Sequence, residues 1–368
     1  MLIVLAVAAL LLVLGLVEHV LHCRRLNAIK LRILVNGTRG KTSVTRLIAG
    51  VLREHGLVTW AKTTGSDARY ILPDGSTCDY RGRRPANIIE QLPFIRLAAR
   101  GNADAVVIEC MALLPENQQL MADKLVCPTH VVLTNAFVDH VDEIGSTARE
   151  TARVLALSVP AGAVTITGDQ RFVPHVSHMV KPDENADLSF KAGFGYPVHD
   201  DNLRLVLALA QVLGIPEDTA VRGMLAAAPD MGMEGPFQVG ACHVVNAFAA
   251  NDPDSFRAAL WDALARGDAV HLLFNHRADR GYRLDAFVPV LREAAGSIVS
   301  LGIIGEDKQH AARRLSVKTG LAALVVEDAY KWLHSRRDEE QTVLCFGNIK
   351  GEAYALIEKL MERRGQDG

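Results

Sequence analysis

The chain has 368 residues, of which 49% are hydrophobic and 22% are charged, and its formal net charge is −2. This length is enough for about two domains, and a net charge so close to zero gives no sign of the basic surface of a nucleic-acid-binding protein. The charge balance does not exclude an anionic substrate, because binding one needs only a local basic pocket.

The first seventeen residues, Met1 to Val17, contain no charged and no strongly polar side chain. As a helix rising about 1.5 Å per residue, they would extend about 25 Å, the length of a short membrane span. The segment lacks the basic start and the cleavage site of a signal peptide, so we expect residues 1–22 to be a retained transmembrane anchor and not a cleaved signal or a buried core helix. Basic flanks stay in the cytoplasm, which predicts that the rest of the chain is cytoplasmic, because four basic residues follow: Arg24, Arg25, Lys30 and Arg32.

A glycine-rich turn follows the first predicted strand, Leu31 to Val35, and precedes a helical pattern over 42–55. In such a strand, turn and helix, backbone N–H groups and the helix N-terminus face phosphate, a lysine neutralises the outer phosphates and a hydroxyl can ligate Mg²⁺. Val35 replaces the first glycine of the general P-loop pattern, but the core Gly-x-x-Gly-Lys-Thr-Ser is intact. We therefore predict a loop that binds ATP and Mg²⁺ through Asn36, Gly37, Thr38, Arg39, Gly40, Lys41, Thr42 and Ser43.

Short β-branched runs alternate with helical patterns along the rest of the chain, which favours an α/β fold with a mostly parallel sheet covered on both faces. The irregular segment 228–236 predicts a boundary between a P-loop domain, 30–230, and a smaller C-terminal α/β domain, 240–368. The segment 66–84 has turn signals and is predicted to form a hairpin. The predicted strands are 31–35, 105–109, 130–135, 163–167, 243–247, 270–274, 297–304 and 342–346, and the predicted helices are 42–55, 115–124, 146–158, 200–213, 217–227, 253–266, 284–295 and a final one.

Ligands of parallel sheets bind at the carboxyl ends of the strands, and polar residues gather at those ends here. Glu109 closes one predicted strand, and residues 134–142 read Thr-Asn-Ala-Phe-Val-Asp-His-Val-Asp. An acid, an imidazole and the loop hydroxyl would together form a Mg²⁺–ATP site. We predict Lys41, Glu109 and His140 as catalytic residues, and Thr42, Glu109 and His140 as metal ligands. The structural alternatives are a helix-capping or ion-paired role for Glu109 and an ordinary surface position for His140.

Further nucleotide contacts are predicted outside this loop. They are Asn135, the Asn251 and Asp252 pair of an Asn-Asp-Pro-Asp-Ser stretch, and Arg277, for which an interdomain ion pair is equally compatible. The loop containing Asn348 and Lys350 would either line the cleft or form a simple glycine turn. Four arginines would either steer a polyanionic substrate or form a solvated face: Arg69, Arg81, Arg83 and Arg84.

These motifs resemble those of the Mur ligase superfamily, which includes the folylpolyglutamate synthases. The Gly-Thr-x-Gly-Lys-Thr-Ser loop, the strand-end Glu109, the Asn-x-x-x-Asp-His motif and the Asn-Asp-Pro-Asp-Ser stretch occur in the family's order. The resemblance narrows to the PgsB/CapB subunits of poly-γ-glutamate synthase, because a hydrophobic segment directly precedes the P-loop and further stretches are similar. These stretches are Thr63 to Arg69, Glu109 to Leu113 with Pro115 to Gln118, and Phe346 to Gly351.

The resemblance implies a Mur-ligase-like central ATPase domain, a Rossmann-like ligase domain, and the ADP-forming ligation of glutamate into capsular poly-γ-glutamate at the cytoplasmic side of the cell membrane. It assigns Thr42 and Glu109 to one Mg²⁺ ion, His140 to a second, and Lys41 to phosphate. It also implies other synthase subunits as partners, at least one a small membrane protein, with glutamate and poly-γ-glutamate as ligands. A homo-oligomer stays open, and no nucleic acid is expected.

The chain departs from this family in two ways. Many Mur ligases hold the second metal with a carbamylated lysine after the Asp-His motif, but no lysine occurs between His140 and Lys181, so that ion is held differently or is absent. The Mur domain for a nucleotide-sugar substrate is missing, which argues against a cell-wall precursor. Three rival hypotheses remain. One is a folylpolyglutamate-synthase-like ligase, for which the membrane anchor would be unexplained. The others are a membrane-anchored P-loop NTPase that drives transport or assembly without forming a bond, and a scaffold subunit that binds nucleotide structurally.

Overall fold

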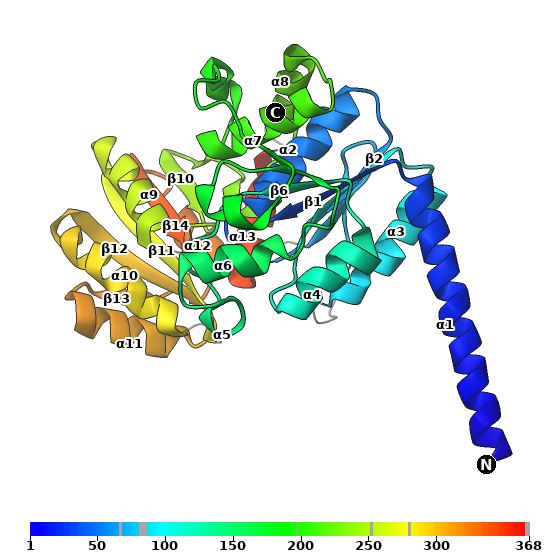
Figure 1. Cartoon of the computed structure of the whole chain (residues 1–368). Helices are drawn as coiled ribbons and strands as arrows, with labels where there is room; N and C mark the ends of the chain where they lie inside the picture. Colours follow the sequence, from blue (N-terminus) through cyan, green and yellow to red (C-terminus); the bar gives the residue numbers. More distant parts are fainter. Residues whose placement is uncertain (66–67, 81–86, 197, 251–252, 279–280, 365–368) are drawn as a thin grey trace. The chain divides into compact units, whose positions relative to one another are not determined.

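The computed structural model describes residues 1–65, 68–80, 87–196, 198–250, 253–278 and 281–364 (Figure 1). The chain forms two compact units: unit 1 contains Met1–Phe194 and Val198–Ala228, and unit 2 contains Gly195–Pro197 and Pro229–Gly368. Each unit is built on its own mainly parallel sheet, which confirms the predicted α/β class. The sequence-based domain bounds of 1–22, 30–230 and 240–368 stay a proposal.

Unit 1 contains the P-loop and all the predicted metal ligands. Its strands are β1 (Leu31–Asn36), β2 (Thr59–Lys62), β3 (Arg69–Ile71), β4 (Thr77–Asp79), β5 (Ala105–Glu109), β6 (His130–Leu133), β7 (Val164–Ile166) and β8 (Met179–Val180). Its helices are α1 (Leu2–Ala28), α2 (Lys41–Glu54), the 3₁₀ turn η1 (Ile88–Glu90), α3 (Gln91–Arg100), α4 (Pro115–Leu120), the π-helical turn η2 (Met121–Val126), α5 (Val141–Ile144), α6 (Ala148–Ala156), α7 (Asp200–Val212) and α8 (Glu217–Leu225), with short 3₁₀ turns η3 (Gln170–His175) and η4 (Ser189–Gly193).

The sheet of unit 1 has the strand order β4-β3-β2-β5-β1-β6-β7-β8. Strands β2, β5, β1, β6, β7 and β8 are parallel, and β3 pairs antiparallel with both β2 and β4. A β3–β4 hairpin thus lies within the segment 66–84 that was predicted to form one, and residues 66–67 and 81–84 of that segment lie outside the described chain. Helices α2, α7 and α8 cover one face, and α3, α4 and α6 cover the other (Figure 1). Because both faces are covered, Ile33, Leu34 and Val35 of β1 are all fully buried.

The strand order brings the predicted site together. β1 lies between β5 and β6, with Val35 in register with Glu109 and Asn36 in register with Leu133. On the far side of β5, Lys62 of β2 is in register with Ile108. Because these strands are parallel, their carboxyl ends meet at one edge of the sheet, where ligands of such folds bind.

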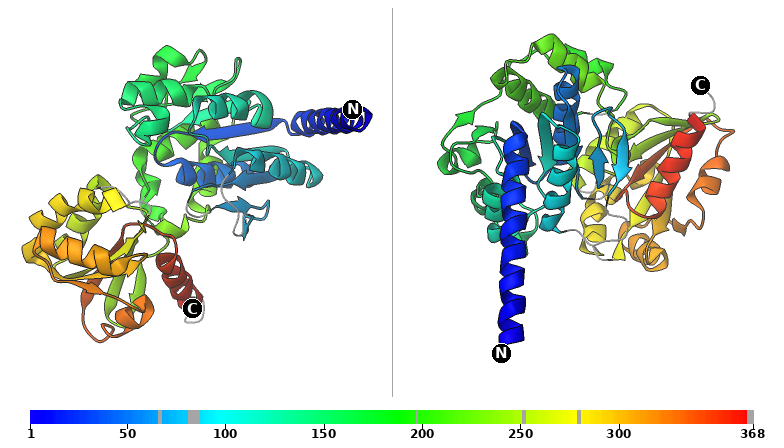
Figure 2. Two further views of the ribbon diagram at one scale, coloured as in Figure 1. Left: turned by 90° about the horizontal axis from the view of Figure 1, so that it is seen from below. Right: turned by 90° about the vertical axis from the view of Figure 1, so that its right-hand side faces the viewer.

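Helix α1 is the candidate membrane span by length and composition. Its most apolar window has a mean hydropathy of 2.6 and no residue buried within the described chain. Figure 2 shows the helix projecting from the rest of unit 1. Only the C-terminal part is fixed to unit 1, where His22 and Leu26 are buried. His22 Nε2 donates to the Leu125 carbonyl at 3.0 Å, and Glu18 accepts from Arg96 of α3 at 2.8 Å. A helix that passes from an exposed apolar half to a docked half fits an anchor better than a core helix.

Unit 2 has a six-stranded sheet in the order β13-β12-β11-β14-β10-β9, in which only β9 is antiparallel to its neighbour among the described strands. One apolar cluster includes the aromatic set Phe256, Phe274, Phe287 and Phe346, and a second includes residues of α12 and α13. The bounds are β9 (Phe237–Val239), β10 (Cys242–Ala247), β11 (Ala269–His276), β12 (Ile298–Gly305), β13 (Ala323–Val325), β14 (Gln341–Phe346), α9 (Pro253–Ala265), α10 (Gly281–Glu293), α11 (Lys308–Thr319), α12 (Ala329–His334) and α13 (Glu352–Arg364), with 3₁₀ turns η5 (Met231–Met233) and η7 (Ala295–Ser297).

Helices α2 and α8 cross closely because a glycine of one faces a glycine of the other. A Cβ atom added to Gly50 would overlap the carbonyl oxygen of Gly223, and one added to Gly223 would lie 2.6 Å from the Cα of Val51. Since α2 follows the P-loop directly, this crossing sets how closely the loop's helix packs.

We expect Gly50→Ala to lower the stability of the protein by about 1–3 kcal/mol, because the added methyl group forces the two helices apart. Thermal or denaturant unfolding of the full chain in detergent measures the loss. The matched control is Gly168→Ala, where an added Cβ meets only Pro182, at 3.9 Å. Equal unfolding midpoints for the two variants would contradict the close crossing.

Candidate active site

The loop between β1 and α2 has two positions that only glycine fits. Gly37 has φ +135° and Gly40 has φ +79°, both in the region that side chains rarely adopt. A Cβ atom on Gly37 would overlap the hydroxyl of Thr134, and one on Gly40 would lie 2.7 Å from Asn202 Oδ1. Gly40 is the N-cap of α2, so the unpaired N–H groups of that helix's first turn, which includes Thr42 and Ser43, face the loop. The backbone is therefore arranged as in an anion-binding loop.

Residues that follow β6 hold this loop in place. Asn135 Oδ1 accepts hydrogen bonds from Thr38 Oγ1 at 2.7 Å and from the Arg39 backbone N–H at 3.0 Å, and Asn135 Nδ2 donates to the Arg39 carbonyl at 3.2 Å. Thr134 Oγ1 donates to the same carbonyl at 2.6 Å. The predicted nucleotide contact Asn135 is thus bonded to the loop, so its first role in this structure is to shape the loop.

The side chain of Asn36 is buried beneath the loop, and the predicted role of this residue in binding nucleotide stays a proposal. Asn36 is 1% exposed, and its amide donates to Gln118 Oε1 and Ser158 Oγ, both at 2.9 Å. Its Oδ1 atom accepts from the Gly37 N–H at 2.8 Å. Asn36 is the last residue of β1, and its side chain joins the start of the loop to the protein interior.

Three of the predicted residues meet at this edge. Thr42 Oγ1 lies 3.1 Å and 3.0 Å from the two carboxylate oxygens of Glu109, and Glu109 Oε2 also accepts from the Thr64 N–H at 2.8 Å. Lys41 Nζ donates to the Gly37 carbonyl at 2.7 Å, so its ammonium group lies against the loop. A hydroxyl and a carboxylate are oxygen ligands of the kind Mg²⁺ prefers, and a lysine and a helix N-terminus favour phosphate. The residues present therefore fit Mg²⁺ and a nucleoside triphosphate.

Among the described residues, His140 has no hydrogen bond or ion pair with that group. It begins the short helix α5 with φ +48°, its side chain is 37% exposed, and its Nδ1 lies 4.0 Å from Glu143 Oε2. Within the described residues, no hydrogen bond or ion pair joins His140 to Thr42 or Glu109, and no three His, Cys, Asp or Glu side chains cluster as a metal site. The role of His140 on a second ion stays a proposal carried by the resemblance.

The structure adds site residues that carried no predicted chemistry. Lys62 ends β2, a strand too short to stand out in the sequence, and Thr64 follows that strand; Lys62 is fully buried. Asp169, after β7, accepts from the Ala136 N–H at 2.9 Å and pairs with Arg171 at 2.6 Å. Burial alone would raise the pKa of Asp169, but hydrogen bonds from Arg171 and the backbone outweigh burial and lower that pKa. Asp169 follows the carboxyl end of a predicted strand, so the search for polar residues at strand ends could have found it.

Cys110 follows Glu109 directly, yet it is not a candidate nucleophile. The side chain is 2% exposed, and burial raises the pKa of its thiol to about 11. A thiol with that pKa is protonated at neutral pH, and the thiolate is the nucleophilic form. We therefore assign Cys110 to packing.

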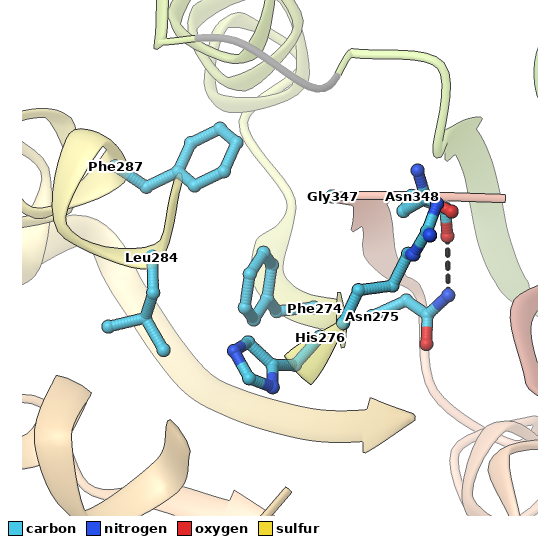
Figure 3. A pocket seen from close by; sticks show the side chains of 8 residues that line it. Phe274, Asn275, His276, Leu284, Phe287, Gly347 and Asn348 are labelled. Atoms are coloured by element: carbon cyan, nitrogen blue, oxygen red, sulfur yellow. Dashed lines mark hydrogen bonds between the residues drawn. The ribbon is translucent and has the colours of Figure 1, made fainter. Parts of the chain in front are cut away.

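In unit 2, a small pocket lies at the carboxyl ends of β11 and β14 (Figure 3). His276 Nδ1 donates to the Glu306 carbonyl at 2.7 Å, and the Asn275 amide donates to the carbonyls of Asn348 and Lys350. Asn348 Oδ1 accepts from the Lys350 N–H at 2.9 Å, and Asn348 also lines the pocket, so both predicted roles of this loop stay open. The lining residues are Phe274, Asn275, His276, Arg277, Leu284, Phe287, Gly347 and Asn348.

Arg277 lines this pocket of unit 2, and its predicted contact with nucleotide stays a proposal. Asn251 and Asp252, which were predicted as nucleotide contacts, lie outside the described residues.

Comparison with solved structures defines the class of protein. Residues 35–176 match the family model "Mur ligase middle domain". The folylpolyglutamate synthase of Thermotoga maritima superposes with a TM-score of 0.70 over 94% of this chain and 92% of that one, at 13% identity. The bifunctional folylpolyglutamate/dihydrofolate synthase of Yersinia pestis, complexed with AMPPNP and a Mn ion, superposes with a TM-score of 0.69 over 93% and 92%, at 16% identity. The chain has the Mur ligase fold, as its motifs predicted.

Sequence relatives define the particular family. Residues 235–363 match the model "Poly-gamma-glutamate synthase CapB C-terminal domain". The chain is 32% identical to "PGA synthase CapB" of Bacillus subtilis (strain 168), over 96% of each chain. It is 31% identical to "Capsule biosynthesis protein CapB" of Bacillus anthracis, over 96% of this chain and 81% of the relative. The chain belongs to the CapB family of poly-γ-glutamate synthases, which confirms the predicted resemblance.

The two asparagines flanking the loop should have different effects when changed. We expect Asn36→Ala to lower stability by about 1–3 kcal/mol, because it leaves buried partners unsatisfied. Asn135→Ala should instead weaken ATP binding about tenfold with a smaller loss of stability, because it frees the loop backbone. Thermal unfolding and titration with a fluorescent ATP analogue separate the two effects, and the reverse pattern would contradict this assignment.

Proposed function

We propose that the chain is an ATP-dependent, ADP-forming amide ligase of poly-γ-glutamate synthesis. Membership of the CapB family supports the product, and the Mur ligase fold supports the reaction class. The observation that carries the site is the contact of Thr42 with both oxygens of Glu109, directly beside the glycine loop and Lys41.

An ionised carboxylate resists attack by an amine, because its carbon is shielded by negative charge and it has no good leaving group. Ligation would therefore start with attack of a γ-carboxylate oxygen on the γ-phosphorus of ATP, which breaks the bond to ADP and gives an acyl phosphate. The amine of glutamate would then attack the carbonyl carbon, and the C–O bond to phosphate would break. The amine proton leaves to water, and the products are an amide, ADP and phosphate.

The residues of unit 1 match the needs of that first step. The N–H groups of the glycine loop and the ammonium of Lys41 would hold the phosphates and offset their charge. Thr42 and Glu109 would hold Mg²⁺, which stabilises charge on the phosphate oxygens when bound. His140, after β6, would face a second ion, and Asn251, Asp252 and Arg277 are proposed to contact the nucleotide from the second domain.

We propose that α1 anchors the chain in the cell membrane with the catalytic units in the cytoplasm, where ATP is present. Its apolar window supports the anchor, and the basic residues that follow support the orientation. Other synthase subunits, including a small membrane protein, would take over a polymer that must leave the cell.

Lys41→Ala should lower the incorporation of labelled glutamate by a factor on the order of 10²–10³, because one cation that offsets phosphate charge is lost. The assay uses membranes containing the synthase, ATP, Mg²⁺ and labelled glutamate, with γ-linked polymer and ADP as readouts. Lys331→Ala, whose side chain is 85% exposed, is the matched control. ATP turnover independent of glutamate would support an NTPase instead, full activity of Lys41→Ala would support a scaffold, and AMP release would contradict the acyl-phosphate route.

Removal of residues 2–17 should release the protein from the membrane fraction, because the exposed apolar part of α1 is lost while His22 and Leu26 stay docked. Fractionation and an unfolding scan of the shortened chain measure release and folding. Retention in the membrane pellet by a folded, shortened chain would contradict the anchor.

A further inference from the structure

A buried ion pair lies at the carboxyl end of β2, next to the strand that ends in Glu109. Lys62 is 0% exposed, and its Nζ lies 3.2 Å from Glu90 Oε2, whose side chain is 16% exposed. Glu90 Oε1 accepts from the Asn87 N–H at 3.2 Å, so both carboxylate oxygens are bonded. Removing two charges from water costs several kcal/mol per ion, and an apolar pair of similar volume is often as stable. Stability alone therefore gives little reason for the pair.

Aromatic rings pack beside this pair. The ring of Tyr80 lies 4.8 Å from Lys62 Nζ and stacks on Tyr70, with centroids 4.3 Å apart and planes 5° apart. Tyr70 in turn lies 5.0 Å from Phe94 of α3. Burial, and then the charge of Glu90, raise the pKa of Tyr70 to about 12, as expected for a phenol in a dry site beside an acid.

The same group fixes the backbone that follows β2. Tyr80 Oη donates to the Thr63 carbonyl at 3.2 Å, and the Thr63 N–H donates to the Arg69 carbonyl at 2.9 Å. One residue later, the Thr64 N–H donates to Glu109 Oε2 at 2.8 Å. Lys62 itself is in register with Ile108, the residue before Glu109. Each step from the ion pair to the carboxylate is thus a bond, a ring contact or an adjacent residue.

We propose that Lys62, Glu90 and Tyr80 act as a positioning group that holds the Thr63–Thr64 backbone, so that the Thr64 N–H fixes the carboxylate of Glu109 toward Mg²⁺. The inference rests on the proposed role of Glu109 as a metal ligand. With one oxygen tied to Thr64 and the hydroxyl of Thr42 within 3.1 Å, the carboxylate has little freedom left to rotate. Groups that orient a metal ligand in this way commonly affect metal affinity and activity.

The main test is the double variant Lys62→Met with Glu90→Gln. It removes both charges of the pair together, so that neither residue is left as a buried charge facing a neutral partner. We expect the Mg²⁺ concentration for half-maximal binding of a fluorescent ATP analogue to rise about 10–100-fold. Binding of that analogue in EDTA should change less than about twofold, because the glycine loop and Lys41 are untouched. The control is Lys308→Met with Glu352→Gln, a partly buried pair of unit 2 at 3.4 Å, which should leave both titrations unchanged.

Tyr80→Phe keeps the stacked ring and removes only the bond to Thr63. It should raise the half-maximal Mg²⁺ concentration about fivefold with only a small fall in the unfolding temperature, because a single hydrogen bond is lost. If the double variant does not fold, this single change decides the question. Wild-type Mg²⁺ dependence in Tyr80→Phe, together with that of the double variant where it folds, would overturn the positioning role. A wild-type protein with Mg²⁺-dependent ATP binding but no polymer would instead overturn the proposed function and leave this inference standing.

Discussion

The hydroxyl of Thr42 and the carboxylate of Glu109 come from segments 67 residues apart, yet they are in contact. They meet because β1 and β5 are parallel neighbours, with Val35 in register with Glu109, so the loop after one strand faces the acid that ends the other. A shift of one residue in this register would turn the Glu109 side chain to the opposite face of the sheet. The site therefore depends first on the register of two buried strands and only then on the chemistry of its side chains.

Two layers of support keep that contact in place. The loop is bonded to Thr134 and Asn135 on its β6 side, and Asn36 fastens its base to Gln118 and Ser158. On the other side, Thr64 holds the acid. The side chains of Asn36, Thr134 and Asn135 thus hold the loop from within the protein, and the proposed ligand contacts fall to the loop backbone, Lys41 and Thr42. Such prior arrangement lowers the reorganisation needed when charge develops in a reaction.

The local parts of the site could be predicted from sequence, and the parts that depend on pairing could not. The glycine loop is contiguous, so its strand, turn and helix are visible in one window, and Glu109 ends a strongly apolar run. The sequence pattern ends the first strand at Val35 and places Asn36 in the loop, whereas in the structure Asn36 is the last residue of β1. Residue patterns do not locate the end of a strand to within one residue. The ion pair of Lys62 with Glu90 could not be predicted, because β2 has only four residues and the two partners are 28 positions apart in the sequence. Helices α3, α11 and α12 are also absent from the sequence-based prediction; α12 has only six residues, and α11 and α12 flank the three-residue β13.

Only Ile29 and Lys30 separate α1 from β1, so the two elements are joined by a very short connection. Ile29 is fully buried, and the guanidinium of Arg32 donates to the carbonyls of Leu26 and Ile29 at 3.0 Å and 2.6 Å, which ties the end of the helix to the start of the strand. If α1 spans the membrane as proposed, unit 1 follows it without a flexible linker. The nucleotide loop of unit 1 would then keep a fixed height and tilt above the lipid headgroups, so a partner that exports the product would have to approach the enzyme at that height.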